Sequence, residues 1–280
     1  MTDDQQSLRG KVAFISGGAR GQGRSHAMAL AARGCDIITF DLAAGTGSTL
    51  YPPATEQDLA QTVREVEWLD RRIVARVADV RDEQQVAAVL AEGLDRLGRV
   101  DIVLANAGIM PTLGRPAAEP QAWHDAIDIM LTGVVHTIEP TLPHLIGQGD
   151  GGSIVITSSA AGLKSPGKVT PGRNRGLLGY VAAKHGVVGL MRSYAMSLAE
   201  YRIRVNSVHP CGVATPMVEN PLFASIARQA PEEYAALQPL LPVSLVECGD
   251  VSDAVLYLVC DTGRYITGVT LPVDGGLLLR

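Results

Sequence analysis

The sequence is poor in cysteine and lysine, and it lacks any long hydrophobic run. Its 4 cysteines are widely separated and form no Cys-x-x-Cys pair, which excludes a disulfide framework or a zinc cluster and predicts reduced thiols. No stretch reaches the ~18 apolar residues of a membrane span. The polar, acidic residues 1–7 are unlike a signal peptide, and the 6 histidines lack the spacing of metal ligands. We therefore expect a cytoplasmic protein that binds no metal.

A strong excess of positive charge is also absent. The 280 residues carry a formal net charge of −5, which argues against a nucleic-acid backbone as the main partner. With 46% hydrophobic and 19% charged residues, the chain is not disordered and can bury a substantial core. The only lysines are Lys11, Lys164, Lys168 and Lys184, so a lysine in a chemically suggestive place is informative.

Short apolar runs alternate with longer amphipathic segments. The runs are rich in Val and Ile and nearly continuous, as strands buried on both faces must be. We expect strands at 11–16, 36–41, 73–79, 101–106, 153–158, 204–209 and 269–273, and helices at 23–33, 56–70, 83–97, 121–146, 178–200 and 249–260. This order predicts a single α/β domain over residues 1–280: a doubly wound, Rossmann-type, seven-stranded parallel sheet with helices on both faces.

Three segments interrupt this alternation. Residues 43–55 contain glycines and prolines, residues 164–177 form a polar loop with basic side chains, and residues 215–246 mix prolines with apolar residues. Long irregular segments inside a compact domain are usually lids or binding loops. A passive surface insertion explains 164–177 equally well, whereas the apolar residues of 215–246 need something to cover.

A glycine-rich turn follows the first expected strand. Gly17, Gly21 and Gly23 precede a helical pattern, and glycines there let the backbone approach a pyrophosphate at the positive end of a helix dipole. An ordinary strand–helix turn is the alternative. Asp41 ends the next strand, where a carboxylate binds ribose hydroxyls and repels a 2′-phosphate. Arg20 favours a cofactor that carries the 2′-phosphate, because its guanidinium can pair with that phosphate. We give Asp41 priority and predict NAD rather than NADP.

Tyr180 and Lys184 are four residues apart in an expected helix. Such residues share a helix face, and a nearby cation lowers the pKa of a phenol from its usual ~10, which makes a phenolate base available. A partly buried tyrosine beside a solvated lysine is the alternative. Ser159 follows the strand at 153–158, at the edge where open α/β sheets bind ligands, although a serine there is more often a helix cap or turn former.

Together and in this order, the motifs resemble the short-chain dehydrogenase/reductase family over nearly the whole chain. The resemblance is closer to its mycofactocin-associated, carveol-dehydrogenase-like branch, because of the residues around Arg20 and the insertion that contains Tyr51. The matching family positions are Ser16, Gly17, Gly21, Gly23, Asp79, Val80, Asn106, Ala107, Gly108, Ser159, Tyr180, Lys184, Asn206, Pro210, Leu271, Asp274, Gly275 and Gly276.

The resemblance implies an NAD-dependent alcohol dehydrogenase. Tyr180 would be the general acid/base as hydride passes between a secondary alcohol and nicotinamide. Lys184 would hold the nicotinamide ribose and lower the pKa of Tyr180, and Ser159 would orient the substrate oxygen. Asp41 would bind the adenosine ribose. The implied cofactor-binding residues are Gly17, Arg20, Gly21, Gln22, Gly23, Asp41, Leu42, Asp79, Val80, Asn106, Ala107, Gly108, Tyr180, Lys184, Pro210, Val213 and Thr215.

Two departures from the family pattern matter. Met130 stands where the family usually has an asparagine assigned to a proton relay, and methionine cannot donate a hydrogen bond. This supports the alternative that the chain is a dinucleotide-binding regulatory protein of the same fold with weakened catalysis. The stretch from Ser159 to Tyr180 is longer than usual, so residues 164–177 could form a flap over the substrate mouth.

The resemblance also implies a substrate loop at about 213–246. Its apolar residues predict a pocket for a medium-sized apolar secondary alcohol or its ketone, terpenoid-like, such as carveol; packing on the core or a neighbouring subunit is the alternative. We expect residues 43–55 to cover the adenosine half of NAD, so that an external redox partner reoxidises bound NADH. Helices 121–146 and 178–200 would form the interface of a homotetramer. The apolar residues are Met217, Val218, Leu222, Phe223, Ile226, Leu237, Leu240 and Leu241.

Overall fold

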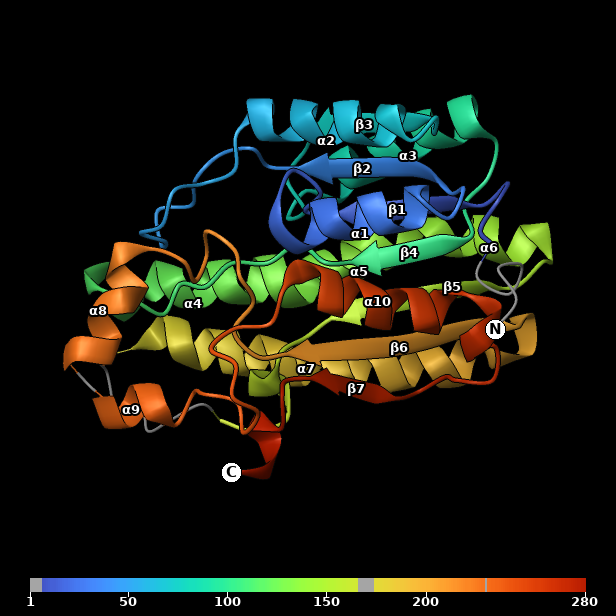
Figure 1. Ribbon diagram of the computed structural model, residues 1–280. Helices are drawn as coiled ribbons and strands as arrows, with labels where there is room; N and C mark the ends of the chain where they lie inside the picture. The colour runs from blue at the N-terminus through green and yellow to red at the C-terminus, as the bar shows by residue number, and fades with distance from the viewer. Residues whose placement is uncertain (1–6, 166–173, 230) are drawn as a thin grey trace.

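Parallel strands form one sheet at the centre of the molecule (Figure 1). The computed structural model describes residues 7–165, 174–229 and 231–280, with the backbone alone at 226, 227, 229, 231 and 233. Within these residues the sheet has 7 strands in the order β3-β2-β1-β4-β5-β6-β7, which confirms the predicted fold class. The strands are β1 (Val12–Ser16), β2 (Asp36–Asp41), β3 (Ile73–Val77), β4 (Ile102–Ala105), β5 (Gly152–Thr157), β6 (Ile203–Pro210) and β7 (Thr270–Val273).

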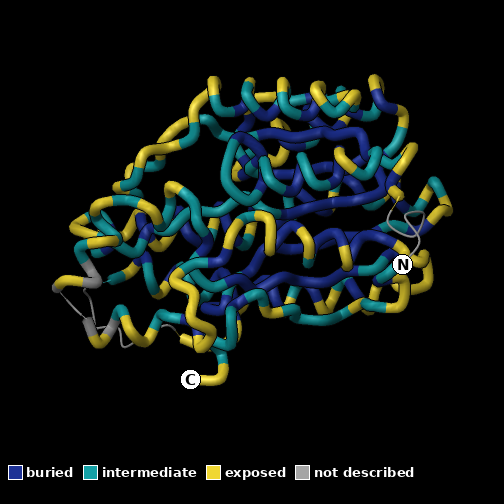
Figure 2. The backbone as a smooth tube through the Cα atoms, viewed as in Figure 1, coloured by how far each residue is buried: buried dark blue, intermediate teal, exposed yellow. Residues whose placement is uncertain are grey.

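Helices cover both faces of the sheet and enclose two hydrophobic cores. Alternate residues of a strand point to opposite faces, so Phe14 belongs to the core under α3, α5 and α7, and Ile15 to the core under α1, α2 and α10. Figure 2 shows the buried backbone concentrated in the strands. No helix in the described ranges is long and apolar enough to cross a membrane. These helices are α1 (Gly21–Ala31), α2 (Glu56–Trp68), α3 (Glu83–Leu97), α5 (Gly133–Ile138), α7 (Arg175–Leu198) and α10 (Cys248–Val259).

The helix expected at 121–146 is not continuous, and that prediction is wrong. A π-helical turn at Asp128–Thr132 separates α4 (Pro120–Ile127) from α5, and a 3₁₀ turn at Glu139–Thr141 separates α5 from α6 (Leu142–Gln148). Pro140 and Pro143 lie at the second break. Proline has no backbone N–H and clashes with the preceding turn, so a helix interior does not tolerate it.

Two further boundaries differ from the expectation for a physical reason. Helix α7 begins at Arg175 rather than 178, because the Asn174 side chain caps it by accepting a hydrogen bond from the Leu177 N–H at 2.8 Å. Strand β3 ends at Val77 and lies at the edge of the sheet, where Val77 is 51% exposed. It is therefore not covered on both faces as the sequence predicted.

The irregular segments lie at the carboxyl ends of the strands. Residues 215–246 contain α8 (Pro221–Gln229) and α9 (Pro231–Ala235). Residues 43–55, which we call the strap, leave β2 and run to the side of the molecule that carries α4 and α8 (Figure 1). The strap ends in a capping box, in which Thr55 and Asp58 bond to each other's backbone N–H at the start of α2. Of the flap predicted at 164–177, residues 166–173 lie outside the described residues.

The contact of α3 with β2 gives a test of this packing. A Cβ at Gly93 would lie 2.4 Å from Cδ1 of buried Ile38, so Gly93→Ala should lower the unfolding free energy by about 1–3 kcal/mol despite alanine's better helix propensity. Gly147→Ala is the control, because its Cβ would meet nothing within 4 Å, and should be neutral or stabilising by up to ~1 kcal/mol. Urea denaturation measures both. Equal stability of the two variants would contradict the tight α3–β2 contact.

Candidate active site

The glycine-rich turn between β1 and α1 leaves no room for a side chain at Gly17 or Gly23. Gly17 has φ +73°, and a Cβ there would lie 2.8 Å from Ala107 Cα. A Cβ at Gly23 would lie 2.0 Å from the Gly17 carbonyl oxygen. Gln22 lies in the first turn of α1, and its Oε1 is buried with no hydrogen-bond partner among the described residues. The turn therefore presents close-packed backbone and one unused acceptor at a helix N-terminus.

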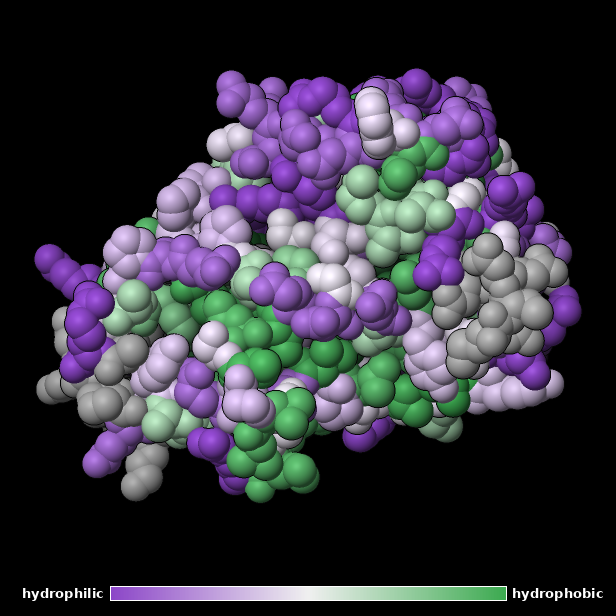
Figure 3. Space-filling model, viewed as in Figure 1, coloured by the Kyte–Doolittle hydropathy of each residue, from purple (hydrophilic) through white to green (hydrophobic). Residues whose placement is uncertain are grey.

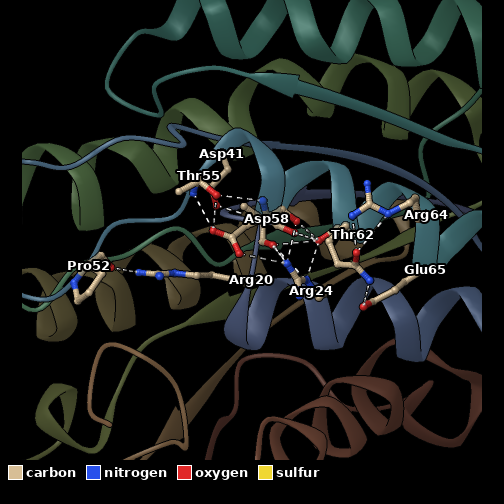
Figure 4. A network of polar contacts seen from close by, with 12 residues as sticks. Arg20, Arg24, Asp41, Pro52, Thr55, Asp58, Thr62, Arg64 and Glu65 are labelled. Atoms are coloured by element: carbon tan, nitrogen blue, oxygen red, sulfur yellow. Dashed lines mark hydrogen bonds and ion pairs between the residues drawn. The ribbon is translucent and has the colours of Figure 1, made fainter. Parts of the chain in front are cut away.

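Arg24 braces this turn from below (Figure 4). Its Nη2 donates to the carbonyl oxygens of Ala19 and Asp58, each at 2.7 Å, and its Nε donates to Thr62 Oγ1 at 3.0 Å. The Thr62 hydroxyl in turn donates to the Gly18 carbonyl oxygen at 3.0 Å. The sequence analysis assigned no role to Arg24. Its position one turn into α1 was visible, but its partners on α2 depend on the fold.

Asp41 holds its carboxylate against the same turn. Oδ2 accepts from the Ala19 N–H and Oδ1 from the Ala43 N–H, both at 3.0 Å. A carboxylate oxygen can accept more than one hydrogen bond, so Asp41 retains capacity for hydroxyl donors, and Leu42 beside it is partly buried. Arg20 extends along the strap instead, and its guanidinium donates to the Pro52 carbonyl oxygen (Figure 4). The strap thus binds the Arg20 guanidinium, which the sequence analysis considered as a partner for a 2′-phosphate.

The loop after β4 lies directly beside the glycine-rich turn. Asn106 Nδ2 donates to the carbonyl oxygens of Ser16 and Gly17 at 3.1 and 3.3 Å, and the Asn106 and Ala107 N–H groups donate to Ser16 Oγ at 3.0 and 3.2 Å. The two loops follow neighbouring strands where the strand order reverses, between β1 and β4. Such switch points are where open α/β sheets bind ligands.

Asp79 and Val80 follow edge strand β3, farther from the turn. The Asp79 carboxylate is paired with Arg81, with Nη2 to Oδ2 at 2.6 Å. Burial raises the pKa of Asp79, but the hydrogen bonds and charge of Arg81 outweigh it and leave the pKa lowered. Val80 is buried, and its carbonyl oxygen lies 3.0 Å from His136 Nδ1. The Asp79 side chain is therefore engaged within the protein.

Tyr180, Lys184 and Ser159 come together at the carboxyl end of β5. The first two share a face of α7, with Lys184 Nζ 5.9 Å from the centroid of the Tyr180 ring. The Lys184 ammonium is 4% exposed and donates to the Thr157 carbonyl oxygen at 2.8 Å. Ser159 accepts from the Ala161 N–H at 3.1 Å and shares a side-chain hydrogen bond with Tyr180.

The expected lowering of the Tyr180 pKa is wrong for the protein alone. Burial raises the pKa of the phenol, and the hydrogen bond with Ser159 lowers it by less. Burial also lowers the pKa of Lys184 to about 8, because the ammonium loses water. The Lys184 ammonium donates its hydrogen bond to the Thr157 carbonyl oxygen rather than to the phenol.

Met130 lies in the π-helical turn and faces the same centre. It is fully buried, and its Sδ and Lys184 Nζ would each lie 3.7 Å from a Cβ at Gly108. π-helical turns are frequent at functional sites. The thioether therefore lies beside the lysine, where it provides no hydrogen-bond donor.

His209 supports Ser159 from β6, a role that the sequence analysis missed. Its Nδ1 lies 2.8 Å from the Ser159 carbonyl oxygen, and its Nε2 lies 2.8 Å from Ser207 Oγ. This pairing assigns the proton to Nδ1. Burial and the charges of Lys184 and His185 lower the pKa of His209 to about 4, against the raising effect of the Ser159 hydrogen bond. Only the Val-His-Pro motif signalled this residue in the sequence.

The chain after β6 returns to the glycine-rich turn. Beyond Pro210, Val213 forms a parallel bridge with Val246. Thr215 Cγ2 would lie 3.2 Å from a Cβ at Gly21, whose φ is +56°. The structure thus brings this segment close to the turn.

The segment expected to line a substrate pocket divides into two parts. Leu240 and Leu241 are 50% and 60% exposed; their N–H groups donate to the Gly275 carbonyl oxygen at 2.9 Å, and their side chains lie against Gly275 and Gly276. These two leucines lie against the C-terminal turn, which favours the alternative that they pack on the protein itself. Phe223 instead packs edge-on against Tyr234, with ring centroids 6.3 Å apart. The Ile226 side chain lies outside the described residues.

Comparison with known proteins identifies similar chains of nearly the same length. A family profile described as Enoyl-(Acyl carrier protein) reductase matches residues 17–278. An uncharacterized oxidoreductase of Mycobacterium tuberculosis is 52% identical, over 97% of each chain. A (-)-trans-carveol dehydrogenase of Rhodococcus erythropolis is 44% identical over 98% of this chain and 99% of its own. The crystal structure of a carveol dehydrogenase from Mycobacterium avium in complex with NAD superimposes with a TM-score of 0.89, at 45% identity over 98% and 99% of the two chains.

The His209 contact predicts a loss of stability in acid. The folded pKa of about 4 lies below the ordinary histidine pKa of 6.5, so the stabilisation is complete above pH 6.5 and is lost as the pH falls toward 4. We expect His209 to account for about 2 kcal/mol of unfolding free energy between about pH 7 and about pH 4.5. Urea denaturation of His209→Asn should show a shallower fall with pH than the native sequence. His185→Asn, at an exposed position, should keep the native slope; an equal slope in all three would refute the assignment.

Proposed function

Because the chain belongs to the short-chain dehydrogenase/reductase family, we propose that it is an NAD-dependent alcohol dehydrogenase. It interconverts a medium-sized apolar secondary alcohol, terpenoid-like as carveol is, and the corresponding ketone. The observation that carries this proposal is the convergence of Ser159, Tyr180 and buried Lys184 beside the glycine-rich turn. The family makes the chain an oxidoreductase; the substrate and the residue roles are our proposal.

The residues present at the switch point fit NAD. The turn at Gly17 and Gly23 has no room for a Cβ, as close approach of a pyrophosphate requires, and Gln22 Oε1 is an unused buried acceptor. Asp41 would hold the adenosine ribose, and Thr215 would lie against the phosphates. The related carveol dehydrogenase of known structure holds NAD. When bound, the nicotinamide supplies the hydride acceptor.

Tyr180 would move the proton in this reaction. Its phenolate form would take the proton of the alcohol hydroxyl as the carbon is oxidised, and the resulting phenol would return that proton in the reverse direction. Ser159, which already shares a hydrogen bond with the phenol, would orient the substrate oxygen. Lys184, fixed by the Thr157 carbonyl oxygen, would hold the nicotinamide ribose. His209 would hold the Ser159 backbone in place through the hydrogen bond to its carbonyl oxygen.

An apolar surface near these residues supports an apolar substrate. Figure 3 shows hydrophobic residues gathered below the strap, over the chain that leads from β6 to α10. Phe223 on α8 is partly buried and packs on Tyr234. The relatives named carveol dehydrogenase point to the same class of alcohol.

The alternative function is a dinucleotide-binding regulatory protein with weakened catalysis. The specific observation in its favour is Met130, buried beside Lys184 where a relay would need a hydrogen-bonding side chain. The complete set of Ser159, Tyr180 and Lys184 favours the enzyme, because a purely regulatory protein has no need of it.

We also propose that NAD stays bound through turnover and that an external redox partner reoxidises NADH. The anchorage of the strap to Arg20 supports this, since the guanidinium lies in the glycine-rich turn and its partner Pro52 in the strap. It also agrees with the resemblance to the mycofactocin-associated branch, to which we assign the chain.

We also propose that the protein is a homotetramer in the cytoplasm. The outer surfaces of α4 and α7 expose large apolar side chains that an interface would cover, namely Trp123, Leu178 and Met196. None of the 4 cysteines, all of which lie within the described ranges, forms a disulfide, which suits a reducing compartment.

Substitution of the phenol tests the enzymatic function. Tyr180→Phe should lower kcat/KM for secondary alcohols by about 10²–10⁴-fold, because it removes the proton acceptor but little volume. NAD binding, measured by titration, should stay nearly unchanged. Tyr201→Phe, at an exposed position, is the control. Reduced-nicotinamide absorbance with an artificial electron acceptor follows turnover. A native protein that binds NAD but oxidises no alcohol in a broad panel would support the regulatory alternative.

Gel filtration tests cofactor retention. The native protein and Arg64→Met, which alters an exposed arginine of α2, should leave the column with stoichiometric NAD. Arg20→Met should lose most of it, because the contact between turn and strap is gone. NAD released by denaturation is quantified by absorbance. Rapid loss from the native protein would contradict retention, without affecting alcohol oxidation in the presence of added NAD.

A further inference from the structure

The strap does not stop above the adenosine side of the turn. The Tyr51 hydroxyl accepts a hydrogen bond from the Met110 N–H at 3.1 Å. Leu50 Cδ1 occupies the space beside Gly114, 2.5 Å from where a Cβ would lie. Both partners belong to the loop that follows β4. The strap therefore links the β2 end of the sheet to the far side of the switch point, as its course toward α4 in Figure 1 suggests.

This loop runs along the face of α7 that carries the catalytic residues. Gly176, Tyr180 and Lys184 are spaced by four and share that face. At one end, Gly108 lies against Lys184 Nζ. At the other, the Pro111 carbonyl oxygen fills the position of a side chain on Gly176, 1.7 Å from an ideal Cβ.

Met110 lies between these two ends, so the part of the loop that binds Tyr51 lies between the points where the loop meets Lys184 and Gly176. The Asn174 side chain secures the loop further along, because its Nδ2 donates to the Thr112 carbonyl oxygen at 3.0 Å. The Tyr51 phenol is thereby held on the catalytic side of α7. The electrostatic effects agree: burial first, and then the Tyr180 phenol, raise the pKa of Tyr51, to about 12.

Tyr51 remains protonated at neutral pH and has the chemistry of a pocket wall. Its ring is apolar and rigid, and its hydroxyl is fixed by the Met110 N–H. The ring is only partly buried by the protein, so one side stays available for contact. A tyrosine so placed adds large contact area at a small entropic cost.

We propose that Tyr51 is a specificity-determining residue of the substrate site, whose ring closes the pocket opposite Tyr180 and limits the alcohols accepted to about one ring in size. This inference rests on the proposed alcohol dehydrogenase function. The strap then has a second role beyond the cofactor: it contributes one wall of the substrate site.

The test compares alcohols of two sizes. Cyclohexenol represents a single ring and decalol a fused pair. Tyr51→Ala should lower kcat/KM for cyclohexenol at least about tenfold, mainly through KM, while decalol is unchanged or improved, because the wall is removed. Tyr51→Trp should do the reverse and lower kcat/KM for decalol at least about tenfold. Tyr265→Ala, at an 86% exposed position, should leave the ratio of the two alcohols unchanged.

Three outcomes would overturn the proposal. An unchanged ratio in both Tyr51 variants would show that the ring contacts no substrate. An equal fall for both alcohols, together with weaker NAD binding by titration, would show that Tyr51 acts only through the cofactor. A native enzyme that oxidises neither these nor any other secondary alcohol would remove the proposed function itself, and this inference with it. In the first two cases the dehydrogenase function stands.

Discussion

The buried ammonium of Lys184 is the constraint on which the site depends. A charge removed from water is costly unless it is hydrogen-bonded, and the Thr157 carbonyl oxygen at the end of β5 provides the bond. The Lys184 carbonyl oxygen accepts a hydrogen bond from Ser158 Oγ at 2.8 Å. Both the main chain and the side chain of Lys184 therefore hold α7 to the end of β5. Tyr180 lies on α7 and Ser159 lies just after β5. This attachment therefore sets their relative position. Met130 and Gly108 close the space around the ammonium.

The topology of the sheet assembles the remaining parts. The strand order reverses between β1 and β4, and such a switch point is where open α/β sheets bind ligands. Asn106 ties the loops that follow these two strands together. Asp41, Thr215 and the strap approach from different parts of the chain, and each touches the glycine-rich turn or the loop beside it. Residues distant in sequence thus meet because parallel strands end on one side.

Features that depend on short-range patterns could be predicted from the sequence. The continuous apolar strands predicted the sheet, and the four-residue spacing placed Tyr180 and Lys184 on one face. The direction of a long irregular segment could not be predicted, because it depends on tertiary partners: the strap was expected over the adenosine side, yet Tyr51 reaches Met110. The Tyr180 pKa was mispredicted because spacing reveals a nearby charge but not the water lost on burial.

Other differences also have specific causes. Pro140 and Pro143 were visible in the sequence, but the apolar periodicity masked the second helix break, where they lie. Leu240 and Leu241 are apolar, and they lie against the surface turn at Gly275 and Gly276. His209 could not be assigned because its partner, the carbonyl of Ser159, lies beyond the end of another strand, β5. For the leucines and for His209, the missing information was the identity of a distant neighbour.

The two anchors of the strap couple the halves of the molecule mechanically. Arg20 holds it to the loop after β1, and Tyr51 holds it to the loop after β4, so the strap bridges the seam between the two mononucleotide-binding halves of the sheet. A thermal fluctuation that widens the seam must stretch or detach one anchor. Insertions or deletions in residues 43–55 would therefore change how far the two loops can separate without disturbing a single strand.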